Sequence, residues 1–191
     1  HGFPEGLHQG RGRELPGFTY RSSAHSGIDT RCVQCHMSKP EEAYKNKLGG
    51  HTFKVYTDNG TPADPSDDAI NQTGCVDCHG TGVELETLEE TKNEIKALLA
   101  ELKLLLPLTS TGVPKNPSDT TLTSLQKDLA YNYYFVEYDG SFGVHNFLYA
   151  KDLLTATIAV AKTLGVERID GAKNFALEQN YPNPFNPSTS V

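Results

Sequence analysis

The pattern of hydrophobic and polar positions divides the chain into a loop-rich first half and a helical second half. Between residues 86 and 106, Leu88, Ile95 and Leu102 recur every seven residues with further leucines between them, as in an amphipathic helix. Pro107 ends this pattern, because proline cannot continue a helix. The spacing therefore predicts a helix over residues 86–106.

Two further helices are predicted after this one. A segment rich in proline and serine, residues 109–118, leads to a helical pattern over residues 120–138, which Gly140 and Gly143 end. A third helical pattern covers residues 145–164. The apolar side chains of the second helix that are predicted to face the core are Leu122, Leu125, Leu129 and Val136.

The rest of the sequence has almost no strand pattern, so the predicted fold class is mainly α with much irregular loop and three long C-terminal helices. Residues 1–31 are predicted to form an extended segment that wraps around the domain. Residues 32–82 contain several runs of residues that are typical of loops. Only 37% of the residues are hydrophobic and tryptophan is absent, so a large conventional apolar core is not expected. We divide the chain into a domain over residues 1–170 and a tail, rich in proline and asparagine, over residues 171–191.

The charge and the first residue of the chain bear on partners and location. A formal net charge of −7 without a basic cluster argues against binding to nucleic acid or to an anionic membrane surface. No run of about 18 apolar residues occurs, so no membrane span is expected. The chain starts at His1 rather than at methionine, which suggests that a leader has been removed. These features predict a secreted protein.

Two short motifs, Cys32–His36 and Cys75–His79, carry the strongest chemical signal. Each has two cysteines three residues apart and a histidine directly after the second, which is the attachment signature of c-type haem. Cysteines at this spacing lie on one side of a helical turn and bind the two haem vinyl groups, and the histidine reaches the iron as proximal ligand. The sequence therefore predicts two covalently bound haem c groups, whose apolar faces replace the missing core in a haem-cored fold. The predicted thioether cysteines are Cys32, Cys35, Cys75 and Cys78, and the predicted proximal ligands are His36 and His79.

A zinc site formed by the two cysteine pairs is the alternative interpretation of these motifs. It accounts for the four cysteines but not for the histidine that follows each pair. We therefore prefer haem.

Each iron needs a second axial ligand, and histidine is the expected one. Met37 directly follows His36, so it does not reach the opposite face of the same iron. Bis-histidine ligation leaves no open position at the iron, which points to electron transfer rather than to substrate chemistry. The candidates for the distal ligands are His25, His145 and His51, followed by His8 and His1.

The order of these features resembles the C-terminal half of the multihaem family of pentahaem cytochrome c nitrite reductase and hydroxylamine oxidoreductase. The resemblance covers roughly residues 20–165. It consists of a histidine before the first motif, a methionine after it, His-Thr-Phe between the motifs, the second motif, long helices and Gly-Val-His-Asn. In this chain these features are His25, Cys32–His36, Met37, His51–Phe53, Cys75–His79 and Gly143–Asn146.

The resemblance also assigns the distal ligands. It implies that His25 ligates the haem of His79, and that His145 ligates the haem of His36. It assigns the histidine between the motifs, here His51, to a haem of the N-terminal half of the family. That half, with its lysine-ligated catalytic haem, has no counterpart here, since the chain holds no Cys-x-x-Cys-Lys and no third haem motif.

The predicted function is that of an extracellular dihaem cytochrome c that transfers electrons. The expected partners are redox proteins or copies of the chain itself. The resemblance implies that His51 has lost its own haem, so that it is either reassigned within this chain or reaches a haem in a neighbouring subunit. Our hypothesis is that His51 or an N-terminal histidine ligates across a subunit boundary, which would join copies of the chain in a haem-bearing polymer. The alternatives are a reductase of nitrite, hydroxylamine or peroxide, which needs an iron with a labile ligand, and a subunit that supplies electrons to a larger oxidoreductase.

Residues 175–189 closely resemble the start of the C-terminal sorting domain of type IX secretion substrates, in the run Phe-Ala-Leu-Glu-Gln-Asn-Tyr-Pro-Asn-Pro-Phe-Asn-Pro-Ser-Thr. The resemblance implies export to the cell surface or the medium.

The loop Asp58–Asp68 carries four aspartates, whose carboxylates are possible ligands of a calcium ion. It lacks the regular ligand spacing of a calcium loop, so we expect a solvated acidic loop.

Overall fold

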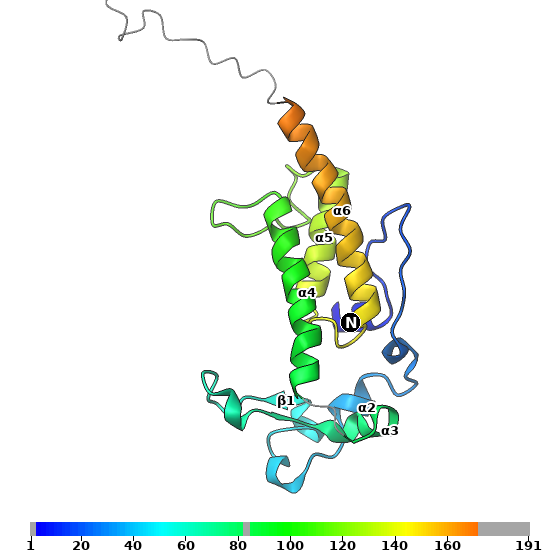
Figure 1. Cartoon of the computed structure of the whole chain (residues 1–191), viewed down its shortest axis with the longest axis vertical. Helices are drawn as coiled ribbons and strands as arrows, with labels where there is room; N and C mark the ends of the chain where they lie inside the picture. Colours follow the sequence, from blue (N-terminus) through cyan, green and yellow to red (C-terminus); the bar gives the residue numbers. More distant parts are fainter. Residues whose placement is uncertain (1–2, 82–84, 172–191) are drawn as a thin grey trace, which may run out of the picture.

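A computed structural model describes residues 3–81 and 85–171 of the chain. Three long helices form a bundle, and a smaller lobe at one end of it carries both cysteine motifs (Figure 1). The prediction of a mainly α fold with little strand is confirmed. The α-helices are α1 (Phe3–His8), α2 (Cys32–His36), α3 (Val76–His79), α4 (Leu85–Leu105), α5 (Ser124–Glu137) and α6 (Phe147–Gly171).

Short elements make up the rest of the regular structure. Two-residue strands pair antiparallel, with Tyr56 opposite Ile70 and Thr57 opposite Ala69. The strands are β1 (Tyr56–Thr57) and β2 (Ala69–Ile70), and the 3₁₀ turns are η1 (Ala24–Gly27), η2 (Glu42–Tyr44), η3 (Gly50–Thr52), η4 (Pro65–Asp67) and η5 (Gln72–Gly74).

The boundaries of the long helices follow local signals. α4 ends just before Pro107, as expected. α5 begins later than predicted because Thr123 is its N-cap: the Thr123 hydroxyl accepts from Gln126 N, and the Gln126 side chain accepts from Thr123 N. α6 also begins later than predicted. Residues 142–145 before it form turns, in which Gly143 has a φ of +95°, outside the helical range.

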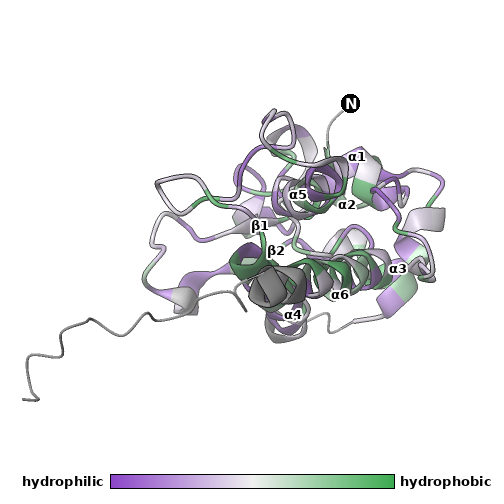
Figure 2. Cartoon of the chain, turned by 90° about the horizontal axis from the view of Figure 1, so that it is seen from above, coloured by the Kyte–Doolittle hydropathy of each residue, from purple (hydrophilic) through white to green (hydrophobic). Residues whose placement is uncertain are grey.

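The helical bundle has a conventional apolar core, contrary to the expectation from composition. α4 and α5 both pack against α6, and apolar segments concentrate on the helices while the loops around them are mostly hydrophilic (Figure 2). Leu125 was predicted to face this core but is 36% exposed. The buried core residues are Leu7, Leu15, Ile95, Leu99, Leu102, Leu106, Leu129, Tyr133, Tyr134, Phe135, Val136, Tyr149, Ala150, Leu153, Leu154, Ile158 and Ala161.

The N-terminal segment lies on the bundle and is held there by side chains of α5 and α6. It includes α1, a short helix that the sequence pattern did not predict, and otherwise has little regular structure up to η1. Gly12 N donates to Tyr149 Oη (2.9 Å), and the fully buried Asn132 side chain pairs with the backbone N–H and C=O of Arg13 (2.9 and 2.8 Å). These bonds satisfy the backbone of an irregular segment that pairs with no strand.

The lobe formed by residues 24–81, here called the motif lobe, has almost no core of its own. Neither α2 nor α3 contains a buried residue. Among the residues of this lobe whose burial is described, the buried positions are Leu48, Gly49, Ala69, Asn71 and Gly74. The burial of so few apolar side chains does not offset the conformational entropy lost when residues 24–81 are ordered. The motif lobe therefore needs a further source of stabilisation.

Among residues 3–81 and 85–171, no helix is long and apolar enough to cross a membrane. The tail predicted over residues 171–191 lies almost wholly outside the described residues, as does His1.

Candidate functional site

Both cysteine motifs form single helical turns. α2 carries Cys32 and Cys35, and α3 follows directly on Cys75 and includes Cys78. None of the four forms a disulfide. Burial raises the pKa of the half-buried Cys35 and Cys75 thiols, and the neighbouring cysteines raise it further. Both thiols therefore stay protonated at neutral pH.

The two motifs touch through Gly74, at the end of η5. A Cβ atom at Gly74 would lie 2.7 Å from Gln34 O and 2.8 Å from Cys35 Cα, so only glycine fits. The buried Asn71 reinforces this contact, because its amide donates to Ser38 O (2.9 Å) and Ser38 Oγ (3.0 Å). The Ser38 hydroxyl in turn donates to Cys35 O (2.9 Å). The second motif is thus fixed against the first.

His25 and His79 face each other although 54 positions separate them in the chain. Their Nε2 atoms lie 3.4 Å apart and their ring centroids 5.7 Å apart. The other ring nitrogen of His25, Nδ1, lies 2.8 Å from Val144 O. A carbonyl oxygen only accepts, so Nδ1 is the donor in this contact and Nε2 is the nitrogen that faces His79.

His36 and His145 form a second pair, with ring centroids 6.0 Å apart. His36 Nδ1 donates to Phe53 O (2.8 Å), and the Phe53 ring stacks on the imidazole with a centroid distance of 4.4 Å. Phe53 has a left-handed backbone, with φ 57°, which is uncommon for a bulky residue. His145 Nδ1 lies 2.6 Å from a carboxylate oxygen of Asp139. Nε2 is therefore the nitrogen left for a metal in both rings.

The spacing of the His25 and His79 nitrogens can be compared with that of two imidazoles that would bind one metal ion. Two imidazole nitrogens bound to one first-row metal at about 2 Å each lie about 4 Å apart. The spacing of the His25 and His79 Nε2 atoms is close to this value, and small side-chain movements are enough to reach it. Each pair joins one histidine of a cysteine motif to one histidine outside it. These residues fit two haem groups attached through the motif cysteines.

The connection between α5 and α6 serves both pairs. Val144 supplies the carbonyl for His25, and the next residue is His145 itself. The fully buried Asn146 accepts from Ser23 N (2.8 Å) and so ties the segment before His25 to the start of α6. This cross-link sets the position of one pair relative to the other.

The remaining described histidines lie outside these pairs. His51 is exposed in η3, and within the described residues no hydrogen bond or ring contact of its imidazole is found. His8 ends α1, and its Nε2 is buried without a hydrogen-bond partner among the described residues. His51, a distal candidate by sequence, is thus not brought together with the four paired histidines.

Within residues 3–81 and 85–171, no three or more His, Cys, Asp or Glu side chains are arranged to hold a metal ion together. His36 and His79 turn instead toward His145 and His25. The arrangement favours two separate pairs of ligands over one tetrahedral cluster.

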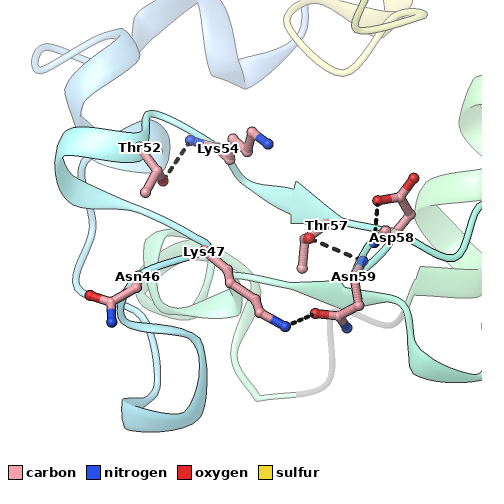
Figure 3. A pocket seen from close by; sticks show the side chains of 8 residues that line it. Asn46, Lys47, Thr52, Lys54, Thr57, Asp58 and Asn59 are labelled. Carbon is pink, nitrogen blue, oxygen red and sulfur yellow. Dashed lines mark hydrogen bonds between the residues drawn. The ribbon is translucent and has the colours of Figure 1, made fainter.

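Aspartates of the acidic loop accept hydrogen bonds from nearby side chains. Tyr56 Oη donates to Asp68 (2.7 Å), which raises the pKa of Tyr56 to about 12, and Thr61 Oγ1 donates to Asp67 (2.7 Å). A shallow hollow of about 350 Å³ lies beside this loop, where Lys47 Nζ donates to Asn59 Oδ1 at 2.7 Å (Figure 3). The hollow is open and contains none of the paired histidines.

Sequence reasoning did not single out the residues that hold the ligands in place. They act through backbone carbonyls, close packing or a carboxylate far from the motifs, and none has a local signature. These residues are Phe53, Asn71, Gly74, Asp139, Val144 and Asn146.

In comparisons with protein-family models, with curated proteins and with solved structures, no match to this chain was found.

Proposed function

We propose that this chain is a dihaem c-type cytochrome that transfers electrons between redox partners. His25 and His79 serve as the axial ligands of one iron, and His36 and His145 serve as those of the other. The observation that carries this proposal is the meeting of each motif histidine with a histidine from a distant segment, with Nε2 free in the rings whose Nδ1 is bonded. When bound, the haem iron supplies one-electron Fe(III)/Fe(II) chemistry.

The poor core of the motif lobe supports the same proposal. Two porphyrins attached at Cys32–His36 and Cys75–His79 supply the apolar surface that the lobe lacks. Val33, Met37 and Phe53 are exposed apolar side chains in or beside the first motif, which makes them available to cover such a surface. The fold is then haem-cored in this lobe and protein-cored in the bundle.

Electron transfer is favoured over a reductase because both axial positions of each iron have an imidazole. A reductase of nitrite, hydroxylamine or peroxide needs a vacant or labile position. Two observations support this order: the His25 and His79 Nε2 atoms lie 3.4 Å apart, and His145 Nδ1 lies 2.6 Å from Asp139. We therefore place the enzyme second.

Copies of the chain are proposed as partners beside other redox proteins, at the cell surface or in the medium. The exposed His51 would reach an iron of a neighbouring copy by displacing one of that copy's four paired histidines. His51→Ala should then lower the mass in solution without altering haem content. Equal masses in solution for the parent protein and for His51→Ala would exclude this role of His51 in assembly.

The central test is to produce the chain in cells that mature c-type cytochromes. We expect a mass increase of two haems and two low-spin bis-histidine signals in the EPR spectrum. His25→Ala and His145→Ala should each convert one signal to high spin. His51→Ala is the matched control and should leave both low-spin signals of the monomeric protein unchanged. A protein that takes up no haem, or that is high-spin before mutation, contradicts the proposal.

A further inference from the structure

Asp139 is a buried carboxylate placed directly behind a proposed iron ligand. It follows α5, its side chain is fully buried, and its Oδ1 lies 2.6 Å from His145 Nδ1. Its second oxygen accepts from Ser141 N (3.1 Å) and from the Ser141 hydroxyl. The carboxylate is therefore the acceptor in its contacts with Ser141, and it faces the Nδ1 of His145.

The other two proposed ligands with a bonded Nδ1 meet neutral groups instead. His25 donates to Val144 O and His36 donates to Phe53 O, each at 2.8 Å. Both acceptors are backbone carbonyls and carry no net charge. The two histidine pairs therefore differ in one respect that matters for redox chemistry: only the pair of His36 and His145 has a carboxylate behind a ligand among the contacts described.

A carboxylate at Nδ1 makes an imidazole a stronger electron donor to the metal. Its negative charge also stabilises a ferric iron more than a ferrous one, and burial weakens the screening of this effect by water. Both effects lower a reduction potential.

We propose that Asp139 is a positioning residue that holds the reduction potential of the His36–His145 iron below that of the His25–His79 iron. This inference rests on the proposed function. An electron delivered by a one-electron redox partner then resides preferentially at the His25–His79 iron. The chain thereby gives a direction to electron flow between two sites that have the same ligand types.

Asp139→Asn tests the proposal, because the amide oxygen still accepts from His145 while the charge is lost. We expect an EPR-monitored redox titration to show that the equilibrium constant for reduction of one iron rises about tenfold, or about 59 mV. The other midpoint should move much less, and both irons should stay low-spin. The His145→Ala protein identifies the affected signal, since it lacks the low-spin signal of this iron.

Asp128→Asn is the matched control, because it removes the same charge from α5 at a residue that pairs with Arg13 and not with a histidine. It should leave the gap between the two midpoints unchanged. Asp139→Glu keeps the charge, so the reduction potential of the His36–His145 iron should stay close to that of the parent protein.

A second variant covers the case in which Asp139→Asn does not fold. Ser141→Ala removes one donor from the carboxylate, so the carboxylate should act more strongly on His145 and the same midpoint should fall. Equal shifts of both midpoints, no shift in either variant, or a change of the His36 iron to high spin would overturn the proposal. A protein without haem would instead refute the proposed function, which separates the two failures.

Discussion

Single residues decide how closely the two cysteine motifs approach. Gly74 has no side chain where the backbone of the first motif passes, and Asn71 fills the adjacent buried space with an amide that binds Ser38. Gly49, with φ +61°, is equally restricted, since a Cβ atom there would lie 2.1 Å from Ser38 O. Contacts with backbone atoms cannot relax by a change of rotamer, so these positions tolerate no larger residue.

Gly74→Ala should therefore destabilise the protein by roughly 1–3 kcal/mol, the range for overpacking. Chemical denaturation of the haem-loaded protein measures this. Gly27→Ala is the control, because a Cβ atom at Gly27 meets nothing within 4 Å and its φ is not positive. Equal stability of the two variants would show that the contact between the motifs is loose.

At the scale of elements, the start of α5 fixes the connection that leads into it. Thr123 and Gln126 form a reciprocal capping box, so two backbone N–H groups at the helix start are satisfied. The same helix ends at Glu137, two residues before Asp139. The register of α5 thus contributes to the position of Asp139.

Thr123→Ala should cost about 1 kcal/mol of stability, because it removes the side-chain acceptor of this cap. Thr123→Ser keeps the hydroxyl and should cost much less. Thermal denaturation of both variants checks the prediction. A loss of the same size in both would point to the methyl group of Thr123 and not to the cap.

An ion pair between elements should make stability depend on pH. Arg21 binds Asp152 of α6 through two hydrogen bonds from its side chain, at 2.9 and 2.7 Å, and lowers the pKa of this carboxyl below its ordinary value of 3.8. A lowered folded-state pKa contributes stability above the unfolded value and loses it as the pH falls through the folded one. Asp152→Asn should therefore be less stable than the parent at pH 7, and the difference should begin to shrink as the pH falls below about 4.

Urea midpoints of both proteins at pH 7, 5 and 3 measure this difference. In an Arg21→Gln background the Asp152→Asn change should have little further effect, because the pair is already broken. A difference that persists unchanged at pH 3 would contradict the assignment to this pair.

For the whole molecule, the two parts draw on different sources of stability. The bundle buries leucines and aromatic residues of α4, α5 and α6 in a continuous core. The motif lobe has few buried positions and presents its cysteines and ligands near the surface. Its order should therefore depend on the groups it binds, whereas that of the bundle should not.

The haem-free protein, produced without cytochrome maturation, should keep the helices of the bundle and lose protection in the motif lobe. Hydrogen exchange followed by mass spectrometry separates the two, with fast exchange expected over residues 24–81 and slow exchange over α5 and α6. Replacing Cys75 and Cys78 by alanine in the matured protein should give an intermediate result, with one haem retained. Uniform protection in the haem-free protein would show that the lobe is stable by itself.

The sequence by itself determined the elements and the chemistry that depend on local order. Periodic leucines and Pro107 predicted α4, and the spacing within Cys32–His36 and Cys75–His79 predicted their roles, because neighbours along a chain are also neighbours on a helical turn. The resemblance to a multihaem family suggested which distant histidines belong together. Composition misled on the core, since a modest apolar fraction was concentrated on three helices.

Only the tertiary structure decided which groups contact the Nδ1 atoms of the paired histidines. Asp139, Val144 and Phe53 act on histidines through contacts that require the packing of α5, α6 and the motif lobe. A carbonyl or a carboxylate has no sequence signature for such a role, because its partner is chosen by position in space. The same reason separates His51 from His25 and His145: their chemistry is identical, and the fold alone places two of them opposite the histidines of the motifs.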